Sequence, residues 1–547
     1  MKWYFVLLLA LSLNLEAQIL GEKEKFTTQD SLRGSNNAYR DWWNVLHYDM
    51  ELEPLYAEKF IQGKNKLRFK VIASPKKSIM QIDLQEPMQL NQAILNGRTI
   101  SNIERNGNVY FLTLDKKLPM NSENELVLEF SGHPHIAIHP PWDGGWIFTK
   151  DKKGRPWMSM SCQGLGASVW FPNKDYQGDE PDEGARLKLI VPQEMKGVAN
   201  GRLVAQEKLG EKMAFQWEVK NPINNYNIAP NIGHYEEIKD VYQGEKGTLD
   251  LTYHVLDYQV EKAKKQFAQT RTMLKSFEHW FGPYPFYEDG FQLVEAPHLG
   301  MEHQSAVAYG NGFENGYLGK DMSGTGWGLK WDFILIHESA HEWFGNNITT
   351  NDLADMWVHE GFTTYSEAIY TEDLFGLEAG RDYVIGLRGR ILNDVPMIGP
   401  YGVNQSGSSD VYFKGANVIH TLRQWINDDA LFRALLRGMN ADFHHQTVDT
   451  KEIEDYWREN TKLNLKPFFD QYLRTVQMPV LEYQFEGNQI KYRWNQVVEG
   501  FDMPVKLANS SIWLYPTAAW KIEKIESMDE KTFEVDRNFY IQTKKIL

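Results

Sequence analysis

Hydrophobic and polar positions follow two different periods along this chain, and the changes of period divide it into segments. From about residue 44 to residue 248, short runs alternate apolar with polar residues or are rich in β-branched residues, as in 66–71 and 187–191. Gly, Asn and Pro separate these runs, which is typical of strands joined by turns. The pattern predicts a large antiparallel β-domain over residues 18–250.

A helical period begins after residue 251. Between 259 and 281, apolar residues recur at every third or fourth position, which predicts one long amphipathic helix. Most segments that follow are also helical, among them 416–426 and 451–459. We therefore expect a mainly helical domain over residues 251–477.

The alternating pattern returns after Met478-Pro479. Residues 490–494 and 511–515 read as strands, and they predict a small C-terminal β-sandwich over residues 478–547. The sequence thus predicts a multidomain α+β fold with an N-terminal antiparallel β-domain, a mainly helical middle domain and a small β-domain at the end.

Composition and charge limit the partners of such a protein. A chain of 547 residues with 42% hydrophobic residues is long enough for several folded domains. Its formal net charge of -15 argues against nucleic acid as a partner, because a polyanion would be repelled. The sequence leaves the oligomeric state open, and a monomer is compatible with it.

The first 17 residues have the character of a signal peptide. Lys2 gives a positive start, residues 3–13 are mostly apolar, and Ala17 offers a small residue before a cleavage point. The apolar run is too short to span a bilayer comfortably. Cys162 is the single cysteine, and a large exported protein without disulfides is more typical of a bacterial periplasm. We expect an exported protein, periplasmic or secreted, without stable membrane insertion.

The motif His337-Glu338-Ser339-Ala340-His341 is the first candidate for chemistry. Residues four apart lie on one face of an α-helix, so both imidazoles can point at a single ion. The apolar run 333–336 before the motif and Trp343-Phe344 after it indicate that this helix is mostly buried. Buried imidazoles and carboxylates need partners, and a metal ion supplies them. The alternative, a polar face turned to solvent, fits this context less well.

Glu360 supplies the third ligand in this hypothesis. It follows His341 after eighteen intervening residues and lies in the first turns of a second predicted helix, 356–375. Two His and one Glu, with a fourth position left to water, form the ligand set of a catalytic zinc site. Glu338 is placed to act as general base on that water. The sequence predicts one Zn²⁺ ion held by His337, His341 and Glu360.

Together with other segments, this motif resembles peptidase family M1, the zinc aminopeptidases typified by aminopeptidase N, with leukotriene A hydrolase as a close relative. The resemblance implies a thermolysin-like catalytic domain and a metallo-aminopeptidase that acts on peptides with a free N-terminus. The matching segments are Leu299-Gly300-Met301-Glu302-His303, Val411-Tyr412-Phe413-Lys414-Gly415, Cys162-Gln163-Gly164 with Trp170-Phe171-Pro172, and Met356-Trp357-Val358-His359-Glu360-Gly361-Phe362.

The resemblance also implies roles for individual residues. Glu302 would bind the free α-amine of the substrate, with Gly300 and Met301 beside it on an edge strand, and Gln163 would help to hold the amine. A fixed carboxylate that pairs with an ammonium accepts only a chain end, which makes an exopeptidase. Tyr412 would donate a hydrogen bond to the oxyanion of the tetrahedral intermediate, because a neutral phenol can be aimed at charge that develops there.

Several positions depart from the family's pattern or extend it. His303 and His359 stand where the family usually has Asn, and Leu299 stands where it usually has Gly. Glu367, seven residues after Glu360, corresponds to a carboxylate that orients a ligand imidazole. Many relatives continue with a large helical C-terminal domain; this sequence ends soon after its small β-domain, so we expect a more open site.

Two alternatives to an aminopeptidase stay open. An endopeptidase of thermolysin type shares the zinc motif but needs no amine anchor, so Glu302 separates the two. A non-catalytic peptide-binding homologue would be marked by the loss of Glu338 or Tyr412, and both are present. The preferred first residue of the substrate is not evident from the sequence.

Overall fold

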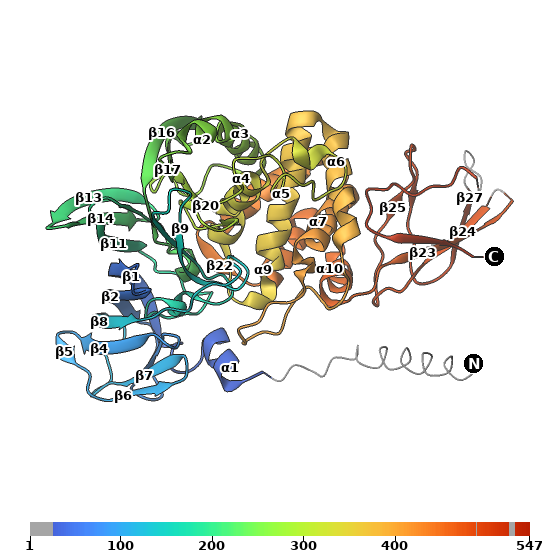
Figure 1. Cartoon of the computed structure of the whole chain (residues 1–547). Helices are drawn as coiled ribbons and strands as arrows, with labels where there is room; N and C mark the ends of the chain where they lie inside the picture. The colour runs from blue at the N-terminus through green and yellow to red at the C-terminus, as the bar shows by residue number, and fades with distance from the viewer. Residues whose placement is uncertain (1–25, 488, 525–530, 547) are drawn as a thin grey trace, which may run out of the picture.

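The computed structural model describes residues 26–487, 489–524 and 531–546, and these form three parts (Figure 1). A β-rich N-terminal part and a smaller C-terminal β part lie on opposite sides of a central helical part. This arrangement confirms the predicted multidomain α+β fold class. The predicted signal peptide, residues 1–17, lies outside the described residues.

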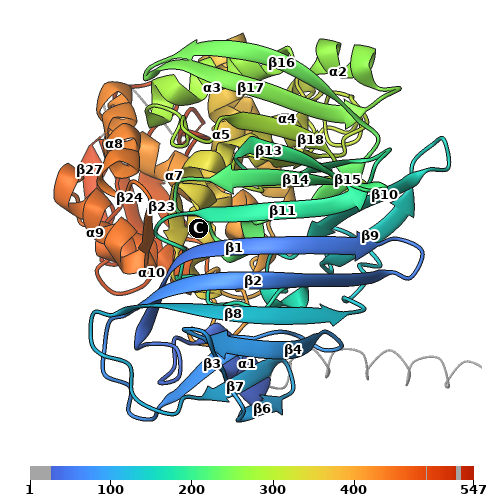
Figure 2. The same cartoon turned by 90° about the vertical axis from the view of Figure 1, so that its left-hand side faces the viewer.

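An eight-stranded sheet forms the main body of the N-terminal part, and its long strands run side by side in Figure 2. In order across the sheet, the strands are β13 (Arg202–Leu209), β14 (Lys212–Val219), β11 (Ala185–Pro192), β1 (Trp43–Leu55), β2 (Phe60–Val71), β8 (Glu123–Gly132), β4 (Gln89–Leu95) and β5 (Arg98–Thr99). Buried and partly exposed residues alternate along most of β1 and β2, as expected for strands with one face on the core. The neighbours are antiparallel except β1 and β11, so the predicted antiparallel domain contains one parallel pair.

Two smaller sheets and one short helix complete this part around a single hydrophobic core. The smaller sheets are β3 (Ile79–Asp83), β7 (Val109–Thr113) and β6 (Ile103–Asn106), and β12 (Lys196–Val198), β15 (Asn231–Gly233), β10 (Pro156–Ser161) and β9 (Gly145–Lys150). Helix α1 (Thr28–Gly34) begins at Thr27, whose hydroxyl accepts a hydrogen bond from the Asp30 amide. Arg40 and Asp83 form an ion pair of 2.9 Å that is completely buried in this part.

A five-stranded sheet joins the N-terminal part to the helices, and it positions one wall of the candidate site. Its order is β16 (Tyr235–Gly244), β17 (Gly247–Leu256), β18 (Phe291–Glu295), β20 (Val307–Tyr309) and β19 (Gly300–Met301). The predicted domain boundary between residues 250 and 251 falls inside β17. Strand β19 is an edge strand, since β20 is its one neighbour among the described strands.

The central part is mainly helical and contains one further small sheet, of β21 (Ile348–Thr350) and β22 (Gln446–Val448). Its helices are α2 (Val260–Gln266), α3 (Gln269–Phe281), α4 (Phe333–Ala340), α5 (Trp357–Phe375), α6 (Leu377–Gly386), α7 (Phe413–Ile426), α8 (Asp429–Asp442), α9 (Thr450–Thr461) and α10 (Leu465–Arg474). The long helix expected over 259–281 is two helices, α2 and α3. The side chains of Gln266 and Gln269 on either side of the break both hydrogen-bond to Asp332, which helps to hold it.

The C-terminal part contains a four-stranded and a two-stranded sheet. The first comprises β27 (Lys521–Lys524), β24 (Gln489–Asn495), β23 (Val480–Glu486) and β28 (Gln542–Lys545), and the second β25 (Val505–Lys506) and β26 (Trp513–Leu514). Its core is continuous with that of the helices, and the Tyr472 hydroxyl of α10 donates to the Tyr540 carbonyl at 2.7 Å. Among the described residues, no helix has the length and apolar character needed to cross a bilayer.

Candidate metal centre and active site

Helix α4 carries His337, and His341 follows directly after its last residue, so both imidazoles lie at this end of the helix. The Asp332 side chain caps its first turn by accepting from the Leu335 amide at 3.2 Å, and every residue of the helix is buried. His337 and His341 are therefore held in the protein interior, one turn apart. The helix ends at Ala340, and the chain then turns through Gly345, whose φ of 127° suits glycine far better than other residues.

Helix α5 brings Glu360 against these imidazoles. Its Oε2 atom lies 3.3 Å from His341 Nε2 and 3.7 Å from His337 Nε2. One donor atom from each of the three residues lies within 4.8 Å of the others. The structure therefore brings together the three residues that the sequence predicted as ligands, although they come from two helices.

The Nδ1 atoms of both imidazoles already have hydrogen-bond partners. His337 Nδ1 donates to Glu367 Oε1 at 2.6 Å, and His341 Nδ1 donates to the Phe344 carbonyl at 2.9 Å. A neutral imidazole whose Nδ1 carries the proton has its lone pair on Nε2. Both Nε2 lone pairs therefore point toward Glu360, as metal ligation requires.

The charges around the three side chains favour a cation among them. Burial would raise the pKa of Glu360, but His341 and His337 outweigh it and hold that pKa below its usual value. Burial would likewise lower the pKa of His341, yet Glu360 and Glu302 raise it to about 9. The cluster stabilises positive charge at its centre, and a metal ion provides such charge in place of ring protons.

These residues fit a zinc ion. The buried Glu360 Oε2 atom has no hydrogen-bond partner among the described residues, so one carboxylate oxygen is left for a cation. Two imidazoles and one carboxylate, all oriented by their surroundings, match the donor set of catalytic zinc sites. The second candidate cluster, Glu302 with Glu338 and His341, shares His341 with the first.

Glu367 orients one ligand imidazole and is itself held by a phenol. While Glu367 Oε1 accepts from His337, its Oε2 accepts from the Tyr383 hydroxyl at 2.6 Å. All three side chains are buried. This chain of hydrogen bonds fixes the ring of His337 and makes its free nitrogen more basic.

We expect Glu367→Gln to weaken zinc binding about 10–100-fold, because the variant loses the carboxylate that orients His337. Competition with a chromophoric chelator measures this affinity. Glu372→Gln is the matched control: Glu372 lies on the same helix, pairs with Arg423 at 2.8 Å and contacts no ligand. Equal weakening in both variants would contradict a specific role of Glu367.

Glu302 lies beside the metal triad within a polar network. It follows β19 directly, and its Oε1 atom accepts from Gln163 at 2.5 Å and from the Tyr226 hydroxyl at 2.9 Å. Its carbonyl accepts from Asn346 at 2.9 Å, just after the metal-binding helix. The side chain of Glu302 is 2% exposed, and its burial raises its pKa. A buried carboxylate of this kind gains most from a positively charged partner.

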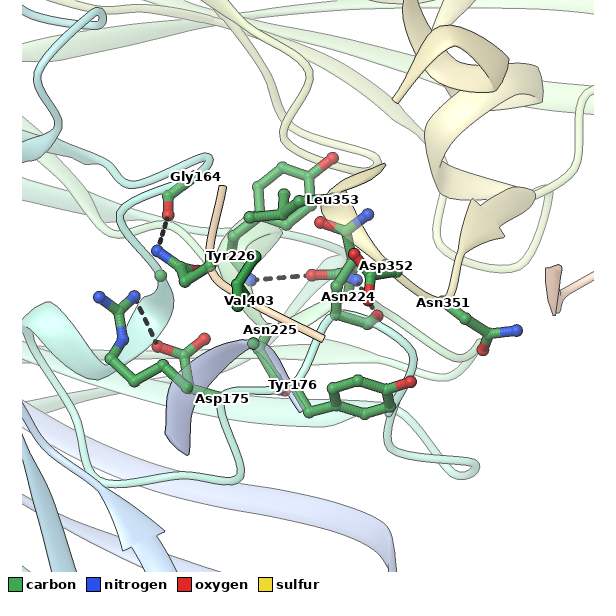
Figure 3. Close-up of a pocket in the computed structure, with 15 residues that line it drawn as sticks. Gly164, Asp175, Tyr176, Asn224, Asn225, Tyr226, Asn351, Asp352, Leu353 and Val403 are labelled. Atoms are coloured by element: carbon green, nitrogen blue, oxygen red, sulfur yellow. Dashed lines mark hydrogen bonds and ion pairs between the residues drawn. The ribbon is translucent and has the colours of Figure 1, made fainter. Parts of the chain in front are cut away.

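Residues from three other parts of the chain donate hydrogen bonds to the loop that carries Gln163. Asn404 donates to the Gly164 carbonyl at 3.0 Å, and Figure 3 shows Gly164 and Val403 at the wall of the small pocket there. Arg33 of α1 and Gln85 both donate to the Leu165 carbonyl. The amide of Gln163 also lies 3.4 Å from Glu360 Oε1. The N-terminal part thus contributes a fixed polar group to a site built by the helices.

One cavity of about 410 Å³ is lined by Glu302, Gln163 and the three candidate ligands. Its walls include Glu338, the three candidate ligands and the partly buried Tyr412, whose ring stacks on His337 with centroids 6.0 Å apart. Burial raises the pKa of Glu338 to about 7. Burial and the nearby Glu360 and Glu302 raise the pKa of Tyr412 well above its usual value, so its hydroxyl remains a neutral donor.

Gly300 and Met301 form the wall of this cavity opposite α4. A Cβ atom at position 300 would lie 2.7 Å from Ile334 Cγ2 and 2.8 Å from Glu338 Oε1, both too close for a side chain. Glycine is therefore required where this edge strand approaches the general-base candidate. Every site residue that the sequence predicted lies in or directly beside this cavity.

The two histidines that depart from the family's pattern lie behind the site. His303 is completely buried, and its ring nitrogens have no hydrogen-bond partner within the part of the chain that the structure describes. His359 Nε2 accepts from the Thr350 amide at 2.9 Å, and burial lowers its pKa to about 3. Neither lines the cavity around the metal triad.

Sequence reasoning missed Tyr226 and Asn346, which hold Glu302, and Tyr383, which holds Glu367. Tyr226 is 76 residues from its partner and lies in a short 3-10 helix, Asn225–Asn227, and no spacing rule links two positions so far apart. It also missed Trp142, which reaches the cavity from a loop of the N-terminal part.

Comparison with known proteins agrees with this geometry. Residues 266–472 match the model of the peptidase family M1 domain. "Probable aminopeptidase 1" of Sulfurisphaera tokodaii is 21% identical over 72% of this chain and 50% of its own length. The leukotriene A-4 hydrolase of Xenopus laevis is 23% identical over 62% of this chain and 57% of its own length. The chain therefore spans about half the length of the curated relatives it matches.

Solved structures show the same fold. An M1 zinc metallopeptidase mutant from Deinococcus radiodurans, bound to a Tyr-Ser-Ala substrate, aligns with a TM-score of 0.68 at 20% identity. The match covers 80% of this chain and 95% of that one. A two-domain M1 zinc metallopeptidase mutant bound to L-tryptophan aligns with a TM-score of 0.65 at 21% identity, over 77% of this chain and 93% of that one.

Proposed function

This chain belongs to peptidase family M1 through its domain at residues 266–472, and from that premise we propose that it is a zinc-dependent aminopeptidase, which removes the first residue of a peptide. The observation that carries the proposal is the buried carboxylate of Glu302 beside the metal triad. Several proteins with a similar sequence are named aminopeptidases, which supports the same function.

His337, His341 and Glu360 would hold the zinc ion. When bound, zinc supplies a Lewis acid that polarises a carbonyl and lowers the pKa of water. We propose one ion, because the second candidate cluster among the described residues needs His341 as well and one Nε2 atom cannot serve two ions.

Glu338 acts as the general base. Its carboxylate takes a proton from the water that attacks the scissile carbonyl, and then returns a proton to the leaving amine. Burial that raises its pKa to about 7 suits both steps, because a group of this pKa gives and takes protons near neutral pH.

Glu302 and Tyr412 select and stabilise the reacting peptide. The α-ammonium of the substrate pairs with Glu302, while Gln163 and Tyr226 keep that carboxylate in place. The Tyr412 hydroxyl donates to the oxygen on which negative charge develops. The edge strand β19 lies alongside, and an extended peptide can add to such an edge.

The proposal is tested with pairs of peptides that differ only in acetylation of the α-amine. We expect free-amine peptides to lose their first residue, as measured by mass spectrometry, and acetylated peptides to be cleaved far more slowly, because the acetyl group removes the charge that Glu302 binds. A chelator should abolish cleavage, and added zinc should restore it.

Each other outcome points to a named alternative. Equal cleavage of acetylated and free peptides at internal bonds would show an endopeptidase. No cleavage of any peptide by the zinc-loaded protein would show a peptide-binding homologue. Cleavage that survives complete removal of metal would contradict a zinc enzyme.

A further inference from the structure

A large indole ring stands exposed at the edge of the candidate site. Trp142 is 71% exposed, although buried tryptophans are common elsewhere in this protein. It nevertheless lines the same cavity as Glu302 and Glu338. An exposed aromatic side chain at the wall of a binding cavity offers a large apolar surface to whatever enters.

The loop that carries Trp142 is held by its own hydrogen bonds. The carboxylate of Asp143 accepts from the amides of Ile138 and His139 at 2.6 and 2.9 Å. The Trp142 amide donates to the His139 carbonyl at 2.9 Å. The loop therefore presents the indole from a defined turn.

The apolar part of the cavity lies on one side of the reacting groups. Ile334 is one helical turn before Glu338, and both approach Gly300. Glu302 lies two residues after Gly300, directly past the end of this edge strand. Because the amine is held at Glu302 and the base is Glu338, the wall around Ile334 faces the part of the peptide beyond the scissile bond.

The surface of this wall is strongly apolar and borders the Trp142 loop. The side chains that form it come from four segments of the chain: Leu299, Tyr317, Met322, Phe333, Ile334 and Trp142. Pro140, on the same loop as Trp142, and Leu299 both line an adjoining cavity. The indole thus lines the same cavity as the apolar side chains next to the candidate base.

We propose that Trp142 is a specificity-determining residue that selects peptides with a large apolar or aromatic side chain in the second position. The inference rests on the proposed aminopeptidase function. The second side chain enters between the indole and the wall of Phe333 and Ile334, and both surfaces lose contact with water. Small or charged second residues gain little from this contact.

The test uses tripeptides that share their first and third residues and carry Phe or Ser in the second position. For the wild-type protein we expect kcat/KM to be higher with Phe. Trp142→Ala should lower the Phe-to-Ser ratio of kcat/KM about three- to tenfold, and Trp142→Phe should restore most of it. The aminoacyl amide with the same first residue lacks a second side chain, so its hydrolysis should be unchanged in both variants.

Ile138→Ala is the matched control, because Ile138 is 75% exposed on the same loop but does not line the cavity. An unchanged ratio in Trp142→Ala would overturn the inference, as would an equal fall of the ratio in Ile138→Ala. A loss of amide hydrolysis equal to the loss with the Phe peptide would also overturn it. If the wild-type protein cleaved none of these free-amine substrates, the proposed function itself would fail.

Discussion

Replacing Glu338 by Gln is expected to lower kcat on free-amine peptides about 10²–10⁴-fold. The variant keeps the shape of the side chain but cannot take a proton from the attacking water. The metal ligands His337, His341 and Glu360 are untouched, so zinc content should stay at the wild-type level. Steady-state kinetics and metal analysis of the same preparation measure both quantities.

Glu342→Gln provides a matched control for this prediction. Glu342 is also fully buried and close in sequence, and burial raises its pKa to about 8. It accepts from the Ser305 amide at 2.8 Å and does not line the cavity. The Glu342→Gln variant should keep kcat within a few-fold of wild type, because Glu342 touches no reacting atom. Equal losses of activity in both variants would show that Glu338 acts through folding and not as a base.

Replacing Glu302 by Gln is expected to lower kcat/KM for free-amine peptides about 10²–10³-fold. The amide cannot pair with the α-ammonium, which then enters a buried site without a counter-charge. Acetylated peptides never had this ion pair, so their slow cleavage should not fall further. The ratio of kcat/KM for free and acetylated peptides is the quantity to measure.

Glu295→Gln controls for the loss of a buried carboxylate from the same sheet. Glu295 ends β18, accepts from the Leu256 amide at 2.7 Å and lies outside the cavity of the metal triad. Its variant should retain the preference for a free amine. A Glu302→Gln protein that still discriminated fully against acetylated peptides would show that another group recognises the amine.

The periodic segments of the chain were predictable because their cause is local. Alternation between about residues 44 and 248 reflects strands with one buried face, and the eight-stranded sheet follows it. The long helix expected over 259–281 was wrong in one respect, since it is broken between Gln266 and Gln269. That break is held by Asp332, a residue more than sixty positions away, so no local pattern could reveal it.

The clustering of the three candidate ligands was predictable for a related reason. Helical geometry alone places His337 and His341 one turn apart, and the burial of their helix is visible in the apolar residues around them. The ligand Glu360 comes from a second helix that follows closely in sequence. The family resemblance added Glu302, Tyr412 and Gln163, whose roles no spacing rule could supply.

The sequence by itself therefore determined the order of β and α parts and the candidates for metal ligands and base, because these depend on the period of one element or on one short motif, whereas the candidate amine anchor came from the family resemblance. Only the tertiary structure decided which groups hold these residues in place, such as Tyr226 on Glu302 and Tyr383 on Glu367. It also brought Trp142 to the mouth of the cavity. Such contacts join residues far apart in sequence, and they are fixed by the packing of whole elements, which leaves no periodic trace along the chain.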